Sequence, residues 1–97
     1  MAIFLVTPLG QNIDLIGVAV RAAIVDESHR YELQNSAGWL VNFKGTSVEL
    51  SHAIGITDSD PEKTPKIGSA IITTLTSYYG RGPTDMWEWL AAQFENR

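Results

Sequence analysis

The sequence predicts an α+β fold in a single domain that spans residues 1–97. Runs of apolar and β-branched residues have strand length, other stretches repeat apolar residues at helical spacing, and glycine or proline clusters separate the two. With 97 residues, 44% hydrophobic and 19% charged, the chain can bury one core and should fold without a cofactor. Because a domain of this size buries a modest share of its surface, self-association as a homodimer is expected.

The first strand is expected at Ile3–Thr7, where the chain is apolar until Pro8 and Gly10. A helix over residues 13–25 follows, with Asn12 as its N-cap. The β-branched content of this stretch favours a strand, but its length and the placement of its charges favour a helix. Its buried face should hold Ile13, Ile16, Gly17, Val20 and Ile24, and its opposite face Asp14, Val18, Arg21 and Val25.

A hairpin is expected next, since residues 30–34 and 39–44 both alternate and residues 35–38 form a turn. Thr46 and Glu49 have the spacing of a capping box for a short helix that Gly55 ends. The buried side of that helix should hold Val48, Leu50, Ala53 and Ile54. After a solvated loop over residues 57–66, Ile67–Tyr79 should form the longest strand.

The last helix should begin at Thr84 as N-cap, with Asp85 and Glu88 near the positive end of its dipole. Its apolar face consists of Met86, Trp87, Leu90, Ala91 and Phe94. The resulting order, strand-helix-strand-strand-helix-strand-helix, is that of a ferredoxin-like split βαβ sandwich (βαββαβ) with an added C-terminal helix. The first and last strands are expected at the centre of the sheet because both are continuously apolar.

This layout resembles the small Cas2-like and SinR-like ferredoxin-fold proteins, with Ile3, Phe4, Leu5 and Val6 in the opening strand. The resemblance covers most of the chain and implies dimers that associate through their sheets. Cas2-like nucleases carry an aspartate at the end of the first strand, where this chain has Thr7 and Pro8. That departure argues against metal-dependent nuclease activity.

Composition narrows the function further. The absence of cysteine excludes disulfides, thiolate catalysis and cysteine-ligated zinc, and it suits a cytoplasmic protein. No segment is long and apolar enough to predict a membrane span. A net charge of −4 with scattered basic residues disfavours nucleic acid as a partner. His29 and His52 match no catalytic or zinc motif, and Asp58, Asp60 and Glu62 lack the glycine and glutamate of a calcium loop, so no metal is expected.

Two groups of residues are candidate sites. The turn before the last helix could hold a phosphate or carboxylate on free backbone N–H groups and a guanidinium. The interpretation that the residues favour is a simple strand-to-helix turn, in which the glycines supply unusual backbone angles and the arginine is solvated. Its residues are Tyr79, Gly80, Arg81, Gly82 and Thr84, and one of the two glycines is expected to adopt a positive φ. Trp89 lies on the opposite side of the last helix from Trp87, so Trp89, with Tyr78, is a candidate interface residue unless it packs on its own sheet.

The function expected from these observations is that of a non-catalytic protein-interaction module acting as a homodimer. A sensor of small ligands or nucleotide phosphates that uses the 80–84 turn is the first alternative. A Cas2-like nucleic-acid-associated protein is the second.

Overall fold

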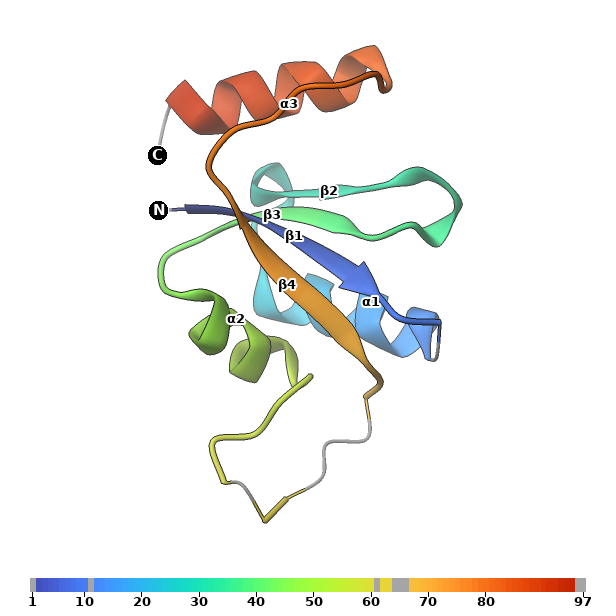
Figure 1. The fold of residues 1–97 in the computed structure, drawn as a ribbon, viewed down its shortest axis with the longest axis vertical. Coiled ribbons are helices and arrows are strands. Elements are labelled where there is room, and N and C mark those ends of the chain that lie inside the picture. The colour runs from blue at the N-terminus through green and yellow to red at the C-terminus, as the bar shows by residue number, and fades with distance from the viewer. Residues whose placement is uncertain (1, 11, 61, 64–66, 96–97) are drawn as a thin grey trace.

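The computed structural model describes residues 2–10, 12–60, 62–63 and 67–95, and its fold is mixed α+β. Within these residues a four-stranded antiparallel sheet has the order β2-β3-β1-β4 and is packed between helices (Figure 1). The strands are β1 (Ala2–Pro8), β2 (Arg30–Glu32), β3 (Trp39–Phe43) and β4 (Ala70–Leu75). The helices are α1 (Ile13–Ala23), α2 (Ser47–Ile54) and α3 (Thr84–Glu95), with short 3-10 turns η1 (Glu27–His29) and η2 (Gln34–Ser36).

The centre of the sheet is formed by β1 and β3, so the expectation for the first strand is confirmed and that for the last strand is wrong. In the described part of the chain, β4 pairs with β1 only and forms one edge, while β2 forms the other. The apolar run in β4 arises because Ile72 packs against the core beneath the sheet and Leu75 against the core above it. A strand can therefore be apolar on both faces and still lack a second neighbour.

The length expected for β4 is also wrong. β4 has six residues and β1 has seven. Residues 76–83 leave the sheet and carry the chain over to α3 (Figure 1).

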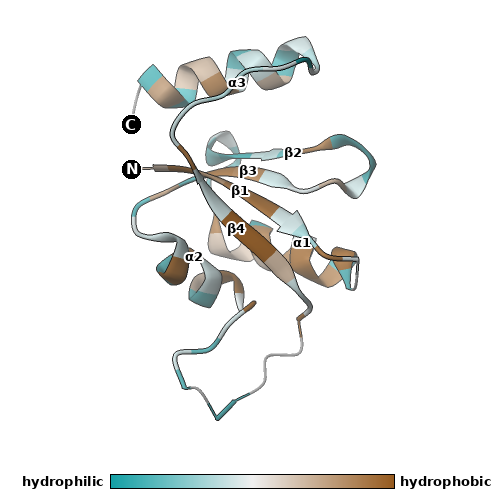
Figure 2. Ribbon diagram, viewed as in Figure 1, coloured by the Kyte–Doolittle hydropathy of each residue, from teal (hydrophilic) through white to brown (hydrophobic). Residues whose placement is uncertain are grey.

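The two faces of the sheet carry separate cores. α1 and α2 cover one face and α3 covers part of the other (Figure 1). Hydrophobic residues are concentrated in β1 and in the middle of β4, between these layers (Figure 2). The core under α1 and α2 contains Phe4, Val6, Ile16, Val20, Ile24, Trp39, Val41, Leu50 and Ile54. The core under α3 contains Ile3, Leu40 and Leu90, with Leu5, Tyr31, Leu33, Leu75, Met86, Trp87, Trp89 and Phe94 packed around them.

Because α3 lies on the second face, β3 is buried on both sides, as residues 39–42 are all buried. The alternating pattern of the hairpin predicted one exposed face. Instead, Leu40 belongs to the α3 core and Asn42 is a buried polar residue. The helix that covers them is more than forty residues further along the chain, which is why local alternation missed it.

The caps of α2 are the ones that the sequence predicted, whereas the N-caps of α1 and α3 differ from the prediction. Thr46 and Glu49 form a complete capping box, with both bonds at 3.1 Å, and Gly55 ends the helix at φ 98°. Asn12 stands at the N-cap of α1 in the left-handed region, but its side chain makes no cap hydrogen bond. At α3, the carbonyl of Pro83 accepts from the N–H groups of Met86 and Trp87, so Pro83 is the N-cap and Thr84 the first helical residue.

The buried faces of α1 and α2 also differ. α1 buries Ile16, Gly17 and Val20 as expected. α2 buries Leu50 and Ile54, whereas Val48 is 61% exposed and Ala53 is exposed. A helix of eight residues has about two turns, and in α2 each turn places about one side chain against the core. Among the described residues, no helix has the length and hydropathy needed to cross a membrane.

Candidate functional site at the open edge of the sheet

The β4 edge offers backbone groups in a fixed pattern. The N–H of Leu9 donates to the carbonyl of Ser69 at 2.9 Å. Leu9 and Ser69 come directly after the paired residues Pro8 and Ala70, so they form a hydrogen-bonded pair of the β1–β4 ladder. Hydrogen-bonded and non-hydrogen-bonded pairs alternate along an antiparallel ladder. The N–H and C=O groups of residues 71, 73 and 75 therefore point toward β1, and those of Ala70, Ile72 and Thr74 point outward from the sheet.

The side chains of β4 leave this edge uncharged. Its sequence, AIITTL, has no charged residue and no proline. The side chain of Ile71 is 53% exposed on the α3 side, and Thr73 and Thr74 are exposed as well. Natural sheet edges are usually protected by charged residues, proline, a bulge or a short strand. β4 has no charged residue and no proline, and with six residues it is not short.

The opposite edge differs from β4 in length and in charge. β2 has only three residues, and two of them, Arg30 and Glu32, are charged. Arg30 is also held in place, since Nη1 donates to the carbonyls of Ile24 at 2.9 Å and Val25 at 3.2 Å. One edge of this sheet is thus protected and the other is not.

A groove of about 280 Å³ runs along the α2 side of β4. Ala70 and Ile72 form part of its lining, opposite Val48 and Ile56. The hydroxyl of Thr57 contacts Ser51 Oγ and His52 Nδ1, both at 2.7 Å, at the rim of the groove. The edge strand is therefore accessible on its side-chain surface as well as along its backbone.

The predicted anion-binding turn is exposed. Gly80 has φ 153°, so one of the two glycines adopts the positive φ that the junction was expected to need, and Gly82 does not. Tyr79 is fully exposed, and Arg81 has no hydrogen-bond or ion-pair partner in the described part of the chain. Thr84 lies in the first turn of α3.

The two predicted interface residues pack against the chain itself. The indole of Trp89 donates from Nε1 to the carbonyl of Ser28 at 2.9 Å and lies 6.2 Å from the ring of Tyr31. Tyr78 stacks on Trp87 at 5.7 Å and remains 39% exposed. Trp89 thus packs on its own sheet, which was the alternative reading of this residue.

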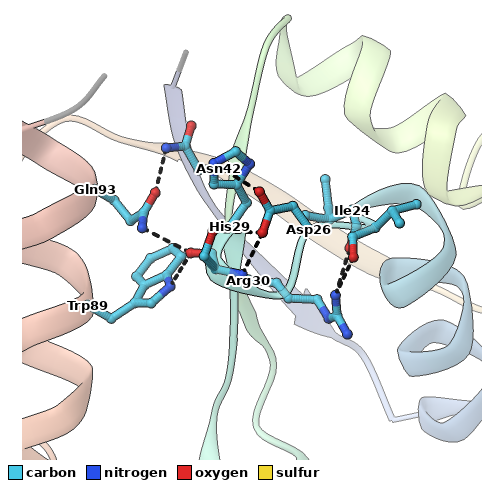
Figure 3. Close-up of polar contacts among 9 residues, drawn as sticks. Ile24, Asp26, His29, Arg30, Asn42, Trp89 and Gln93 are labelled. Carbon is cyan, nitrogen blue, oxygen red and sulfur yellow. Dashed lines mark hydrogen bonds and ion pairs between the residues drawn. The ribbon is translucent and has the colours of Figure 1, made fainter.

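Polar contacts fix α3 to the sheet at the same place (Figure 3). Gln93 donates from Nε2 to the carbonyl of Ser28 at 2.9 Å and accepts from Nδ2 of Asn42 at 2.7 Å. Asn42 is 3% exposed, and its Oδ1 is buried without a partner among the described residues. Trp89, Gln93 and Asn42 form what we call the α3 clamp.

The acidic side chains serve local structure. The hydroxyl and the N–H of Ser28 both donate to Oδ1 of Asp26. These two bonds hold the pKa of Asp26 below its usual 3.8, and the bond from the hydroxyl has the larger effect. Burial and the hydrogen bond to Asp85 raise the pKa of Tyr31 above 10.0. Asp58 and Asp60 each accept a backbone N–H two residues further on, and no group of three or more potential metal ligands occurs among the described residues.

Comparison with protein-family models finds no match, and neither curated proteins nor solved structures match the chain significantly. The candidate site therefore depends on geometry alone. Sequence reasoning missed it because β4 was expected at the centre of the sheet. The uncharged run of residues 70–75 was visible in the sequence, but only the strand order turns that run into an open edge.

Proposed function

We propose that this chain is a non-catalytic interaction module that forms a homodimer by antiparallel pairing of β4 with β4 of a second copy. The observation that carries the proposal is the uncharged edge of β4, with three residues whose backbone groups point outward. Unpaired edge groups are a ready template for another strand.

The outward-pointing residues favour a second copy as the partner. Ala70, Ile72 and Thr74 are symmetric about Ile72, so a two-fold axis at Ile72 pairs Ile72 with itself and Ala70 with Thr74. In that register every outward N–H and C=O of β4 finds a partner, and the two sheets join into one. The interface is isologous, which is the commonest arrangement in soluble homo-oligomers.

Two finer assignments belong to the same proposal. We assign the fold to the ferredoxin-like split βαβ class with an added C-terminal helix, supported by the element order and by β1 lying between β3 and β4. We also assign the protein to the cytoplasm, because a cysteine-free chain suits a reducing compartment.

Light scattering coupled to size exclusion tests the dimer. The wild type should elute with twice the 10.7 kDa mass of the chain. Thr74→Pro removes an outward N–H without removing a bond to β1, and it should give a monomer that remains folded by circular dichroism. Thr76→Pro, one residue beyond the strand, is the matched control and should remain a dimer.

A second variant distinguishes loss of the dimer from misfolding. Thr74→Lys keeps all backbone groups of β4 but places a charge on the edge, and it should also weaken the dimer. A wild type that is monomeric at all concentrations, or two Thr74 variants that dimerise as well as the wild type, would overturn the proposal.

A further inference from the structure

We infer that the outer face of α1 is a second self-association surface, on which α1 of one copy packs antiparallel against α1 of another copy. The two-fold axis of this contact passes beside Val18. The surface consists of residues of α1 alone, so the contact does not depend on pairing of β4.

α1 is apolar on its outer face as well as on its buried face. Asp14 and Arg21 are its only charged residues, and the others are apolar or glycine. On the outer face, Leu15 is 52% exposed, Val18 is 57% exposed, and Ala22 is exposed as well. These three residues have the spacing of one stripe along a helix, and a helix that is apolar all round is normally buried. The stripe is therefore expected to contact a further surface.

The two charged residues of α1 lie along one margin of this stripe. Seven residues separate Asp14 from Arg21, so the two lie about 20° apart around the helix, on the same side of Val18. Neither side chain has a hydrogen-bond or ion-pair partner in the described part of the chain. A Cβ at Gly17 would lie 3.6 and 3.7 Å from the terminal nitrogens of Arg21, so the guanidinium folds back along this margin. It can turn toward a second copy without breaking a hydrogen bond.

Antiparallel packing about Val18 brings the opposite charges together. The two-fold axis reverses the helix direction and keeps each margin on its own side, so the charged margins of the two copies meet. Asp14 lies four residues before Val18 and Arg21 three residues after it, which is about 6.0 and 4.5 Å along the helix. Asp14 of each copy therefore stands nearly level with Arg21 of the other, and the contact gains two ion pairs.

The apolar margin is complementary in size about the same axis. Leu15 lies three residues before Val18 and Ala22 four residues after it, so the leucine of one copy packs against the alanine of the other. In a parallel pair, the charged margin of each copy would instead lie against the apolar margin of the other. The pattern thus selects a second copy of the chain, in the antiparallel orientation, as the occupant.

The size of the face makes the contact weak. Each copy contributes one helix face, whereas stable interfaces take roughly 20–30 residues a side. The contact should form at high protein concentration and leave the mass measured in dilute solution unchanged. In a chain that also pairs through β4, it links one dimer to the next.

Cysteine cross-linking tests the contact, because a disulfide traps even a weakly populated complex. The chain has no cysteine, so Val18→Cys supplies a single thiol at the proposed axis. Helix axes about 8–10 Å apart bring the two Cα atoms within the range that a disulfide spans. Under mild oxidation, Val18→Cys should cross-link about tenfold faster than Val25→Cys, which lies off the axis. Val25 is the matched control because it is 79% exposed.

Equal rates for the two cysteine variants would overturn the proposal. Adding Thr74→Lys, which weakens β4 pairing, should leave the rate of Val18→Cys unchanged. A rate that falls with Thr74→Lys would assign the cross-link to β4 pairing and also overturn the proposal. Sedimentation of the protein with phosphatidylcholine vesicles, without a cross-link in Val18→Cys, would assign the stripe to a membrane surface and overturn it as well.

Charge variants of Val18→Cys test the orientation, with circular dichroism to verify that each is folded. Asp14→Arg alone, or Arg21→Asp alone, places like charges opposite each other and should slow cross-linking about tenfold. An equal mixture of these two variants restores both pairs of opposite charges and should recover the rate. Glu88→Arg and Arg81→Asp make the same charge changes outside α1 and should leave the rate unchanged. A mixture that cross-links no faster than either variant alone would overturn the antiparallel contact.

Discussion

Single residues at the strand-to-helix junction were predictable from the sequence because backbone conformation depends on neighbours in the chain. The flanking glycines predicted a positive φ, and Gly80 has it. A Cβ at Gly80 would meet nothing within 4 Å, so the cost of Gly80→Ala is one of backbone strain alone, about 1 kcal/mol or more.

At Gly82, a Cβ would lie 2.5 Å from the terminal methyl of Met86, which can rotate away, so Gly82→Ala should cost less than Gly80→Ala. Arg81→Ala should change stability by less than about 0.5 kcal/mol, since the guanidinium has no partner within the residues that the structure describes. Urea unfolding of the three variants measures this order. Equal, negligible losses for both glycine variants would contradict the strained-turn account.

Asp26 gives a prediction about pH. Because Ser28 holds the pKa of Asp26 below 3.8, the ionised carboxylate favours the folded state above the unfolded pKa. This contribution is lost as the pH falls through the lower, folded pKa. Ser28→Ala removes the hydroxyl bond, which is the largest cause, and should raise the pKa of Asp26 toward 3.8. Carboxyl NMR titration measures both values, and an unchanged pKa in the variant would refute the assigned cause.

At the scale of elements, the packing of α3 on the sheet could not be predicted from local sequence patterns. Asn42 looked like an exposed position of an alternating strand, yet it is buried because Gln93, fifty-one residues away, covers it. The capping box at Thr46 and Glu49 was predictable, since both partners lie within one helical turn. Local pairs are visible in a sequence, whereas contacts between distant elements are not.

The α3 clamp yields a stability prediction. Gln93→Ala leaves the amide of Asn42 buried without its partner and should cost about 1–3 kcal/mol. Replacing both residues, Asn42→Leu with Gln93→Leu, removes donor and acceptor together and should recover much of that loss. Urea denaturation compares the variants. A double variant no more stable than Gln93→Ala would show that the clamp is not the source of the cost.

The capping box is tested in the same way. Thr46→Ala removes the acceptor for the N–H of Glu49 and should destabilise the fold by about 1 kcal/mol. Ser47→Ala, one position further on and outside the box, is the control and should have a smaller effect on the urea midpoint.

For the whole molecule, the sequence predicted the element order and the two classes of structure, but not the place of β4. The position of β4 in the sheet depends on which side of β1 the chain reaches after α2, and no residue of β4 indicates that side. The candidate site follows from this choice, because an apolar strand at the centre of a sheet has no free backbone groups, whereas the same strand at the edge has three residues with outward N–H groups.

Amide hydrogen exchange along β4 tests pairing of the two edges most directly. The N–H groups of residues 71, 73 and 75 should be protected at every concentration, since they face β1. Those of Ala70, Ile72 and Thr74 should become protected only as the protein concentration rises and dimers form. If these three amides exchange at unprotected rates at all concentrations while their neighbours stay protected, β4 does not pair with a second copy.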